Sequence, residues 1–208
     1  MAIKKGYLSS LGIGVELTFG AGIPAGGAGA IPIISHSLKR NVNLTTSNVI
    51  RGSRNPAGPV TGFVDVSGDI VVPVGYTSFG ALLNLIGGAL GTLSFAALDA
   101  QPSLAIVDGG AMTYKGCKVS KLSFKFGGDG EITATLSIIG KDGAAGGVVT
   151  GAAGAIDPVL WKHLTLSLGG ASTTQIEEIS VDVDFGLDGS VYTIGENGTR
   201  REIPEGLA

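Results

Sequence analysis

The chain has 208 residues, of which only 15% are charged and 36 are glycine, and its formal net charge is −3 at pH 7. A surface that binds nucleic acid by displacing counterions needs clustered Lys and Arg, so this balance argues against such a surface. Aromatic residues make up 6%, which leaves Val, Ile, Leu and Ala for the core and is unusual for an enzyme with a large packed pocket. The composition favours many short strands and turns, in a protein that contacts copies of itself through weakly charged surfaces.

The cysteine content and the apolar stretches limit where the protein is expected. Cys117 is the single cysteine, which excludes an intramolecular disulfide. Glycines and Glu16 interrupt the stretch after Lys4 and Lys5, so no secretory signal is predicted. No window has the apolar length of a membrane span. We expect a soluble protein, without membrane insertion, that is made in a reducing cytoplasm.

The chain divides into an N-terminal segment and a larger β domain. Residues 1–32 are predicted to be an N-terminal segment with one short strand, Val15 to Phe19, followed by the Gly/Ala/Pro loop GAGIPAGGAGAIP. We call this segment the N-terminal arm. Residues 33–208 are predicted to form the β domain. Within it, NVNLTTSNVIRGSRNPAGPVTG and SVDVDFGLDGSVYTIGENGTRREIPEG share an order of strand, turn, arginine pair, proline and glycine. Duplication of one half from about residue 157 and chance similarity are both left open.

The stretch VTGFVDVSGDIVVPV alternates apolar and polar residues along a single predicted strand. Such a period of two is typical of a half-buried antiparallel strand. The expected inward side chains are Val64, Val66, Ile70, Val72 and Val74. The expected outward side chains are Asp65, Ser67 and Asp69.

One segment breaks the β pattern. In TSFGALLNLIGG the apolar residues Phe79, Leu82, Leu83 and Ile86 have the spacing of one helix face. Thr77 or Ser78 can cap its start and Gly87 can end it. We expect one short helix that covers the side or the end of a β core.

The second half contains a predicted hairpin and a later acidic strand. CKVSKLSFKF, GGDG and EITATLSIIG give strand, turn and strand, with glycines at the turn. The expected inward side chains there are Leu122, Phe124, Phe126, Ile132, Ala134, Leu136 and Ile138. HLTLSL and EEISVDVDF continue the pattern. In the last of these, Ile179, Val181, Val183 and Phe185 are expected inward, and Asp182 and Asp184 outward.

No constellation of catalytic or metal-binding residues emerges from the sequence. His36 and His163 have no second ligand at metal spacing. Lys115 and Lys118 could lower the pKa of Cys117, but no base accompanies the thiol, which favours a structural role. The glycine runs lack the strand-then-helix setting of a dinucleotide site, and no Walker lysine is present. We therefore expect no enzyme activity, cofactor, metal or small-molecule substrate.

The acidic strand faces allow more than one interpretation. Asp65 and Asp69, and likewise Asp182 and Asp184, repeat along one side of a strand. A solvated surface accounts for most such patterns. Paired carboxylates for glycoside hydrolysis fit poorly, because no aromatic platform for a sugar accompanies them.

Several motifs in order carry a family resemblance over most of residues 14–143. They are GVELTFG, the R-x-x-R-N-P turn, the G-x-x-D-V-S-G-D-I-x-x-P-V strand, the F-G-x-L-L helix and the P-S-L … G-x-K-V hairpin. In order and spacing the chain resembles the tail tube (major tail) proteins of long, non-contractile-tailed bacteriophages.

The resemblance implies an antiparallel β-sandwich or barrel protomer with one short flanking helix. Such protomers form hexameric rings whose inner strands join into one β-barrel, and the rings stack into a tube that conducts DNA during ejection. The implied partners are further copies of the chain, the tape-measure protein and phage DNA in the lumen, and tail-tip and terminator proteins. The implied location is the virion, after assembly in the host cytoplasm.

The resemblance also assigns expected roles to residues. Because DNA is an anion, Asp65, Ser67 and Asp69, or Asp182 and Asp184, are candidates for the lumen. Arg51, Arg54, Arg200 and Arg201 are candidates for contacts between subunits or rings, with exposed loops as the alternative. The loops Gly20 to Ile31 and Asp142 to Ala155 are long enough to reach a neighbouring ring. The alternatives for function are an inner-tube subunit of a contractile secretion system and a surface carbohydrate-binding or decoration module.

Overall fold

The computed structural model describes residues 10–22, 27–46, 58–76, 80, 83, 101–109, 112–127, 130–154, 156–173 and 177–203. These residues are mainly β, as the alternating sequence predicts. The strands are β1 (Leu11–Val15), β2 (Ala28–Ile31), β3 (Ser35–His36), β4 (Lys39–Thr45), β5 (Val60–Pro73), β6 (Leu104–Asp108), β7 (Met112–Gly127), β8 (Thr133–Gly140), β9 (Asp142–Ala145), β10 (Val149–Thr150), β11 (Leu166–Leu168), β12 (Ala171–Thr173) and β13 (Glu178–Asp184), and the 3-10 helix η2 (Trp161–His163) precedes β11.

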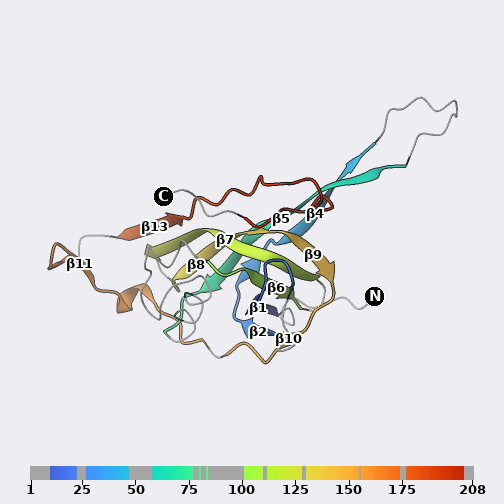
Figure 1. The fold of residues 1–208 in the computed structure, drawn as a ribbon. Helices are drawn as coiled ribbons and strands as arrows, with labels where there is room; N and C mark the ends of the chain where they lie inside the picture. Colours follow the sequence, from blue (N-terminus) through green and yellow to red (C-terminus); the bar gives the residue numbers. More distant parts are fainter. Residues whose placement is uncertain are drawn as a thin grey trace, which may run out of the picture.

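Eleven of these strands form one sheet that curls around the core (Figure 1). The long strand β7 belongs to both parts of this sheet. The first half of β7 pairs with β6 on one side and with β9 on the other, and β1, β2 and β10 follow β6. The second half of β7 pairs with β8 and β13, and β5, β3 and β4 follow β8. We call these two parts the first and the second half-sheet. The strands β11 and β12 form a separate hairpin.

The core lies between the two half-sheets and contains side chains from both. Leu11 and Ile106 of the first half-sheet and Ile70 and Leu122 of the second belong to one buried cluster. The predicted inward set of β5 is confirmed, because every member is buried: Val64, Val66, Ile70, Val72 and Val74. The predicted hairpin is confirmed as β7 and β8. Its inward set is buried except for Phe126, which packs on the core while partly exposed.

The last predicted strand is confirmed as β13, which lies at an edge of the second half-sheet. Val183 and Phe185 pack against the core. Val181, which the alternation places inward, is 41% exposed. An edge strand has a neighbour on one side only, so its apolar side chains are covered less completely.

Two segments leave the body of the sheet in opposite directions (Figure 1). One consists of β4 and the first part of β5, which run beyond the end of β8; we call residues 41–45 and 60–65 the arm. The other is the β11–β12 hairpin. After β13 the chain doubles back over the second half-sheet, and we call residues 185–203 the strap.

Three predicted local features differ from the structure. The first strand is Leu11–Val15 rather than Val15 to Phe19, because both carboxylate oxygens of Glu16 accept backbone N–H groups of Gly20 and Gly22 at 2.9 Å and turn the chain. The two Gly/Ala-rich loops contain strands: β2 in the first, and β9 and β10 in the second. Their backbones pair with their own sheet, which small side chains permit.

Two further predictions are not tested. Of the predicted helix the structure describes only Gly80 and Leu83, so the helix lies outside the described residues; Leu83 is buried. The division at residue 32 stays a prediction, although β1 and β2 pair with each other and β1 pairs with β6.

Candidate assembly surfaces

The outward side chains of the second half-sheet are mostly polar, with Val71 of β5 and Ile139 of β8 as apolar members of the same face. The register sets Asp69 of β5 beside Ser137 of β8, and Ser137 beside Lys121 of β7. Lys121 in turn lies beside Asp184 of β13. We call this surface the polar face. It carries Glu178, Ser180, Asp182, Asp184, Lys121, Ser123, Lys125, Thr133, Thr135, Ser137, Asp65, Ser67, Asp69, Lys39 and Asn41.

The structure thus brings together all five residues that the sequence offered for the lumen. Asp65, Ser67 and Asp69 were one candidate set and Asp182 and Asp184 another, on strands more than a hundred positions apart. Both sets lie on the same face of the same half-sheet, with β8 and β7 between them. Whether this face lines a lumen stays a prediction.

Hydrogen bonds and ion pairs hold the acidic side chains of the polar face in place. Ser137 Oγ donates to Asp69 Oδ1 at 2.7 Å and Ser123 Oγ to Asp182 Oδ1 at 2.5 Å. Lys121 Nζ lies 3.2 Å from the same Asp182 oxygen. The Ser123 hydrogen bond, and after it Lys121, lower the pKa of Asp182 from its ordinary value. At neutral pH this carboxylate is therefore charged.

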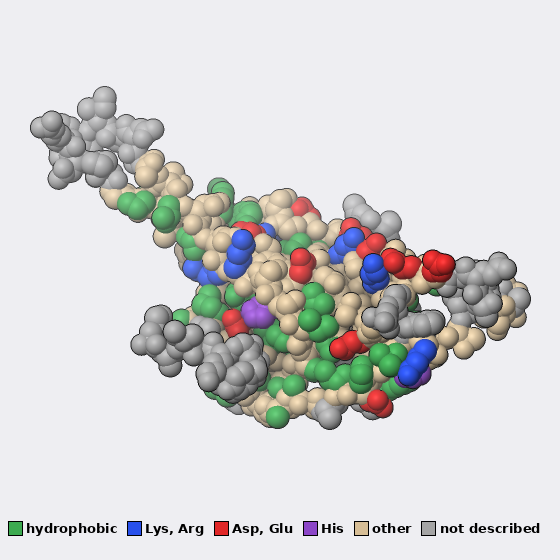
Figure 2. Space-filling model, turned by 180° about the vertical axis from the view of Figure 1, so that it is seen from behind, with side chains coloured by type: hydrophobic (Ala, Val, Ile, Leu, Met, Phe, Trp, Pro, Cys, Tyr) green, Lys and Arg blue, Asp and Glu red, His purple; other side chains and the backbone are tan. Residues whose placement is uncertain are grey.

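Lysines lie among these acids, and the view from behind shows both signs of charge interspersed along the upper part of the molecule (Figure 2). Lys125 pairs with Glu178 at 3.1 Å. The sequence pattern does not mark Lys39, Lys121 and Lys125 as site residues. Their alternation with inward residues was visible there for Lys121 and Lys125, but their pairing with β13 depends on tertiary register.

Both ends of the second half-sheet are strand edges within the described residues. β13 pairs only with β7, and β4 pairs only with β5. An unpaired edge presents a row of N–H and C=O groups that a strand of another chain can bind. One protomer therefore carries two edges and a polar face on a single curved half-sheet.

The arm exposes apolar side chains away from the core. Leu44 is 63% exposed, Val60 62% and Phe63 55%, and apolar groups are visible along the arm in Figure 2. Adjacent exposed apolar residues of this kind are typical of surfaces that contact another protein. Arg51 and Arg54 lie between the two arm strands, outside the described residues.

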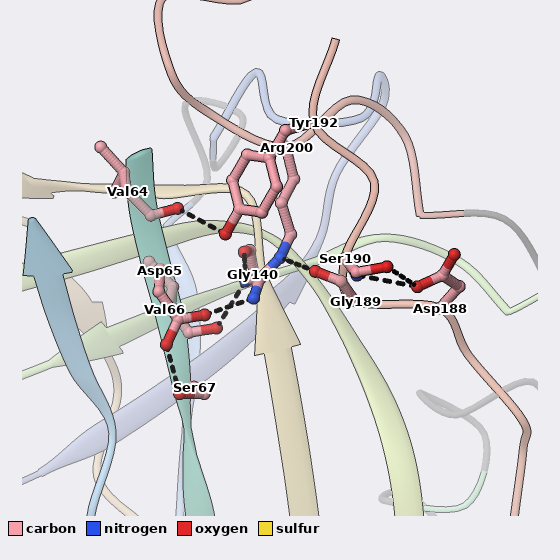
Figure 3. A network of polar contacts seen from close by, with 10 residues as sticks. All are labelled: Val64, Asp65, Val66, Ser67, Gly140, Asp188, Gly189, Ser190, Tyr192 and Arg200. Carbon is pink, nitrogen blue, oxygen red and sulfur yellow. Dashed lines mark hydrogen bonds and ion pairs between the residues drawn. The ribbon is translucent and has the colours of Figure 1, made fainter. Parts of the chain in front are cut away.

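Arg200 is buried and binds its own chain (Figure 3). Its Nη1 donates to the carbonyl oxygens of Val66 at 3.1 Å and of Gly140 at 2.8 Å, its Nη2 pairs with Asp65, and its Nε donates to Gly189. Asp65, offered for the lumen, is thus an intramolecular partner of Arg200, offered for subunit contacts. Arg201 is exposed. These contacts were not predicted, and no local sequence pattern connects positions so far apart.

The remaining candidates for chemistry have structural surroundings. Cys117 is fully buried, and its burial, together with the nearby Glu16 carboxylate, raises the pKa of the thiol, whereas Lys115 and Lys118 had suggested a lower one. A thiol held in its neutral form is a weak nucleophile. The described residues contain no group of three or more His, Cys, Asp or Glu side chains placed to hold a metal ion. They also contain no helix with the length and hydropathy needed to cross a membrane.

Comparison with known proteins identifies the family. A search of curated proteins found no match. A family model described as phage tail tube protein matches residues 6–208, which is nearly the whole chain and extends past residue 143, where the sequence motifs end. The chain therefore belongs to the phage tail tube protein family, as a structural component of the virion that assembles into the tail.

Proposed function

We propose that this chain forms closed rings, six protomers to a ring, that stack into the tail tube and surround DNA as it leaves the virion. The proposal rests chiefly on one observation: the second half-sheet has strand edges on both sides and a mostly polar face between them. A sheet that can be extended on both sides closes into a barrel when identical copies repeat around an axis, and closure removes the exposed edges.

In the proposed ring, the β13 edge of one protomer pairs with the β4 edge of the next. On the core side β13 carries apolar residues, and β4 carries Val42 beside Arg40, whose charge is paired with Asp142. Both strands carry polar residues on the outer side, so pairing them continues the polar face. The contact is heterologous, because it joins two different surfaces of the protomer. It produces a closed ring when the rotation from one protomer to the next divides a full turn into equal steps.

The polar face then lines the lumen. Its serines and threonines offer hydrogen bonds without net charge, and its carboxylates repel phosphates. Two of its three lysines, Lys121 and Lys125, have carboxylate partners. DNA can slide along such a surface because it releases few counterions there and binds weakly.

The arm is proposed to contact neighbouring copies, which would cover Leu44 and Val60 and bring Arg51 and Arg54 to the same contact. Arg201 remains a candidate for such contacts, whereas Arg200 can take part only if it leaves its present partners. The tape-measure protein inside the tube, and tail-tip and terminator proteins at its ends, are the further proposed partners, and assembly is placed in the host cytoplasm.

Electron microscopy of concentrated protein tests the tube directly. Negative staining should show hollow rods or stacked rings, and top views should give the number of protomers. Monodisperse particles without rings at all concentrations, together with binding to a glycan array, would instead support the surface module.

Disulfide trapping tests the edge pairing. A variant carrying Ser180→Cys in β13 with Asn41→Cys or Asn43→Cys in β4 should give covalent ladders up to the ring size on oxidation, in the one register that brings the two Cβ atoms close. Variants with one new cysteine should give no ladder beyond a dimer. Native Cys117 does not interfere, because it is buried. Rings without ladders in any register would overturn this pairing while leaving the tube intact.

A further inference from the structure

We propose that the strap is a latch that blocks the β5 edge next to the end of β8 against strand pairing with a second copy of this chain. This edge differs from the β13 and β4 edges of the proposed ring, and the argument does not depend on that ring. It rests on where β8 ends, on which atoms of β5 the strap binds, and on how the strap is held.

The last pairing of β8 with β5 is that of Gly140 with Val66. Beyond it β5 continues into the arm and pairs only with β4 on its other side. The backbone groups of Val64 that point to the β8 side are therefore beyond the reach of β8. Without another partner they would form an exposed continuation of the sheet edge, which is the geometry that binds foreign strands.

The strap supplies both missing hydrogen bonds at Val64. The Val64 N–H donates to the carbonyl oxygen of Gly198 at 2.8 Å, and the Tyr192 hydroxyl donates to the Val64 carbonyl oxygen at 3.2 Å. The Tyr192 ring also lies against Phe63, with ring centroids 4.6 Å apart. The strap occupies the edge without offering a regular strand of its own at this place.

Gly198 lets the strap approach this closely. Its φ is +79°, and a Cβ there would lie 2.7 Å from the carbonyl oxygen of Gly62. Asn197 before it has φ 52°. The strap thus turns back on itself at the edge, where Tyr192 and Arg200 form a bridge with each other.

Arg200 attaches the strap at the end of β8 (Figure 3). It binds the two carbonyl oxygens at the end of the β8–β5 ladder and pairs with Asp65, so its charge is neutralised where β8 stops. Lys141 adds an ion pair to Glu196 at 2.9 Å. Elsewhere the strap is held by the buried Ile203, whose carbonyl oxygen accepts a hydrogen bond from Lys118 Nζ at 3.2 Å. Because the attachment at the end of β8 passes through one guanidinium group, its loss should open the edge locally and leave the sheet folded.

The test compares Arg200→Gln with Arg201→Gln, a matched control that removes the neighbouring, exposed arginine. Hydrogen exchange of the Val64 amide reports opening of the edge, and the Leu136 amide in β8 reports unfolding of the sheet. Arg200→Gln should raise the Val64 exchange rate by about tenfold or more, as expected for lost charge-assisted hydrogen bonds, with Leu136 unchanged. Arg201→Gln should change neither rate. It is a control for exchange alone, because Arg201 is also proposed to contact neighbouring subunits.

Sedimentation velocity over a concentration series then measures self-association of the same proteins. If one open edge suffices for each contact, the apparent dissociation constant should fall by the same factor by which Val64 exchange rises; if two open edges pair with each other, it should fall by the square of that factor. Irregular aggregates support the latch, since they would use the freed edge. Association that yields only regular rods would point to the β13 and β4 edges and overturn the latch. Faster Val64 exchange with unchanged association would overturn it.

If Arg200→Gln also raises the exchange rate of the Leu136 amide, the substitution has destabilised the sheet itself, and a second variant tests the latch. Tyr192→Phe removes only the hydroxyl that donates to Val64 and keeps the ring against Phe63. It should also raise the Val64 exchange rate and lower the apparent dissociation constant, with the same relation between the two as for Arg200→Gln, and both factors should be smaller than for Arg200→Gln. No change in either quantity would overturn the latch. Neither result bears on the tube, which is judged from micrographs of the unaltered protein.

Discussion

At the scale of single residues, the acids of the polar face depend on the hydroxyl groups of neighbouring strands. Asp182 accepts a hydrogen bond from Ser123 on β7, and this bond is the largest cause of its lowered pKa. A lowered pKa means that the folded protein favours the carboxylate. The resulting stability is present above the pKa of the unfolded chain and is lost as the pH falls through the folded value.

We predict that Ser123→Ala raises the pKa of Asp182 toward its ordinary value of about 3.9. Lys121 should hold it somewhat below that value, since its ion pair remains. Carboxyl carbon chemical shifts followed over a pH titration measure the change. Asp188 serves as an internal control, because its pKa is lowered by Ser190 on the strap instead. An unchanged Asp182 titration would show that Lys121 alone sets its charge.

At the scale of elements, β7 connects the two half-sheets through a break in its regular pairing. Gly116 lies at this break with φ +60°, and its N–H donates to both carboxylate oxygens of Glu16 at 3.1 Å. A Cβ here would lie 2.8 Å from Cβ of Lys141. The inward residues accordingly change from even to odd positions between Tyr114 and Cys117.

We predict that Gly116→Ala lowers the free energy of unfolding by about 1–3 kcal/mol, the usual cost of holding a non-glycine residue in a left-handed conformation. Urea denaturation followed by circular dichroism measures it. Gly130→Ala is the matched control, because no atom lies within 4 Å of its added Cβ and no positive φ is required there. It should change stability by less than about 0.5 kcal/mol. Equal effects of both substitutions would mean that the break in β7 tolerates a side chain.

The elements also show how far sequence reasoning reaches. β5, β7 and β8 could be predicted because alternation between a core and an outer face is written into each strand locally. The outward positions of Asp65, Asp69, Asp182 and Asp184 followed from the same alternation. The strands β2 and β9 could not be predicted, since Gly and Ala give no contrast between the faces of a strand, and β10 has only two residues, too few to show a pattern.

That the two acidic sets lie on the same face could not be predicted, because this depends on the order of the strands in the sheet. The pattern within a single strand does not contain that order. The Arg200 contacts were out of reach for a related reason. They join the strap to β5 and β8 through backbone carbonyl groups, which leave no trace in the side-chain pattern.

At the scale of the whole molecule, the polar face decides what the proposed tube does to DNA. The contacts of the two β5 acids decide which of them can be altered to test this. Asp65 pairs with Arg200, so replacing it would disturb the strap as well as the face. Asp69 is exposed and its carboxylate accepts only the Ser137 hydroxyl among the described contacts.

We predict that phage particles carrying Asp69→Lys assemble tubes of normal length but eject DNA several-fold more slowly. The added cations would bind phosphates along every ring, and the counterions released on binding make this attraction weaken as salt rises. The delay, measured by the fluorescence of a dye that binds released DNA, should therefore shrink at higher salt. Asp157→Lys makes the same change of charge outside the polar face and should eject at the normal rate. Normal ejection from Asp69→Lys particles at low salt would place the polar face away from the DNA. The half-sheet would then have to close with its other face toward the lumen.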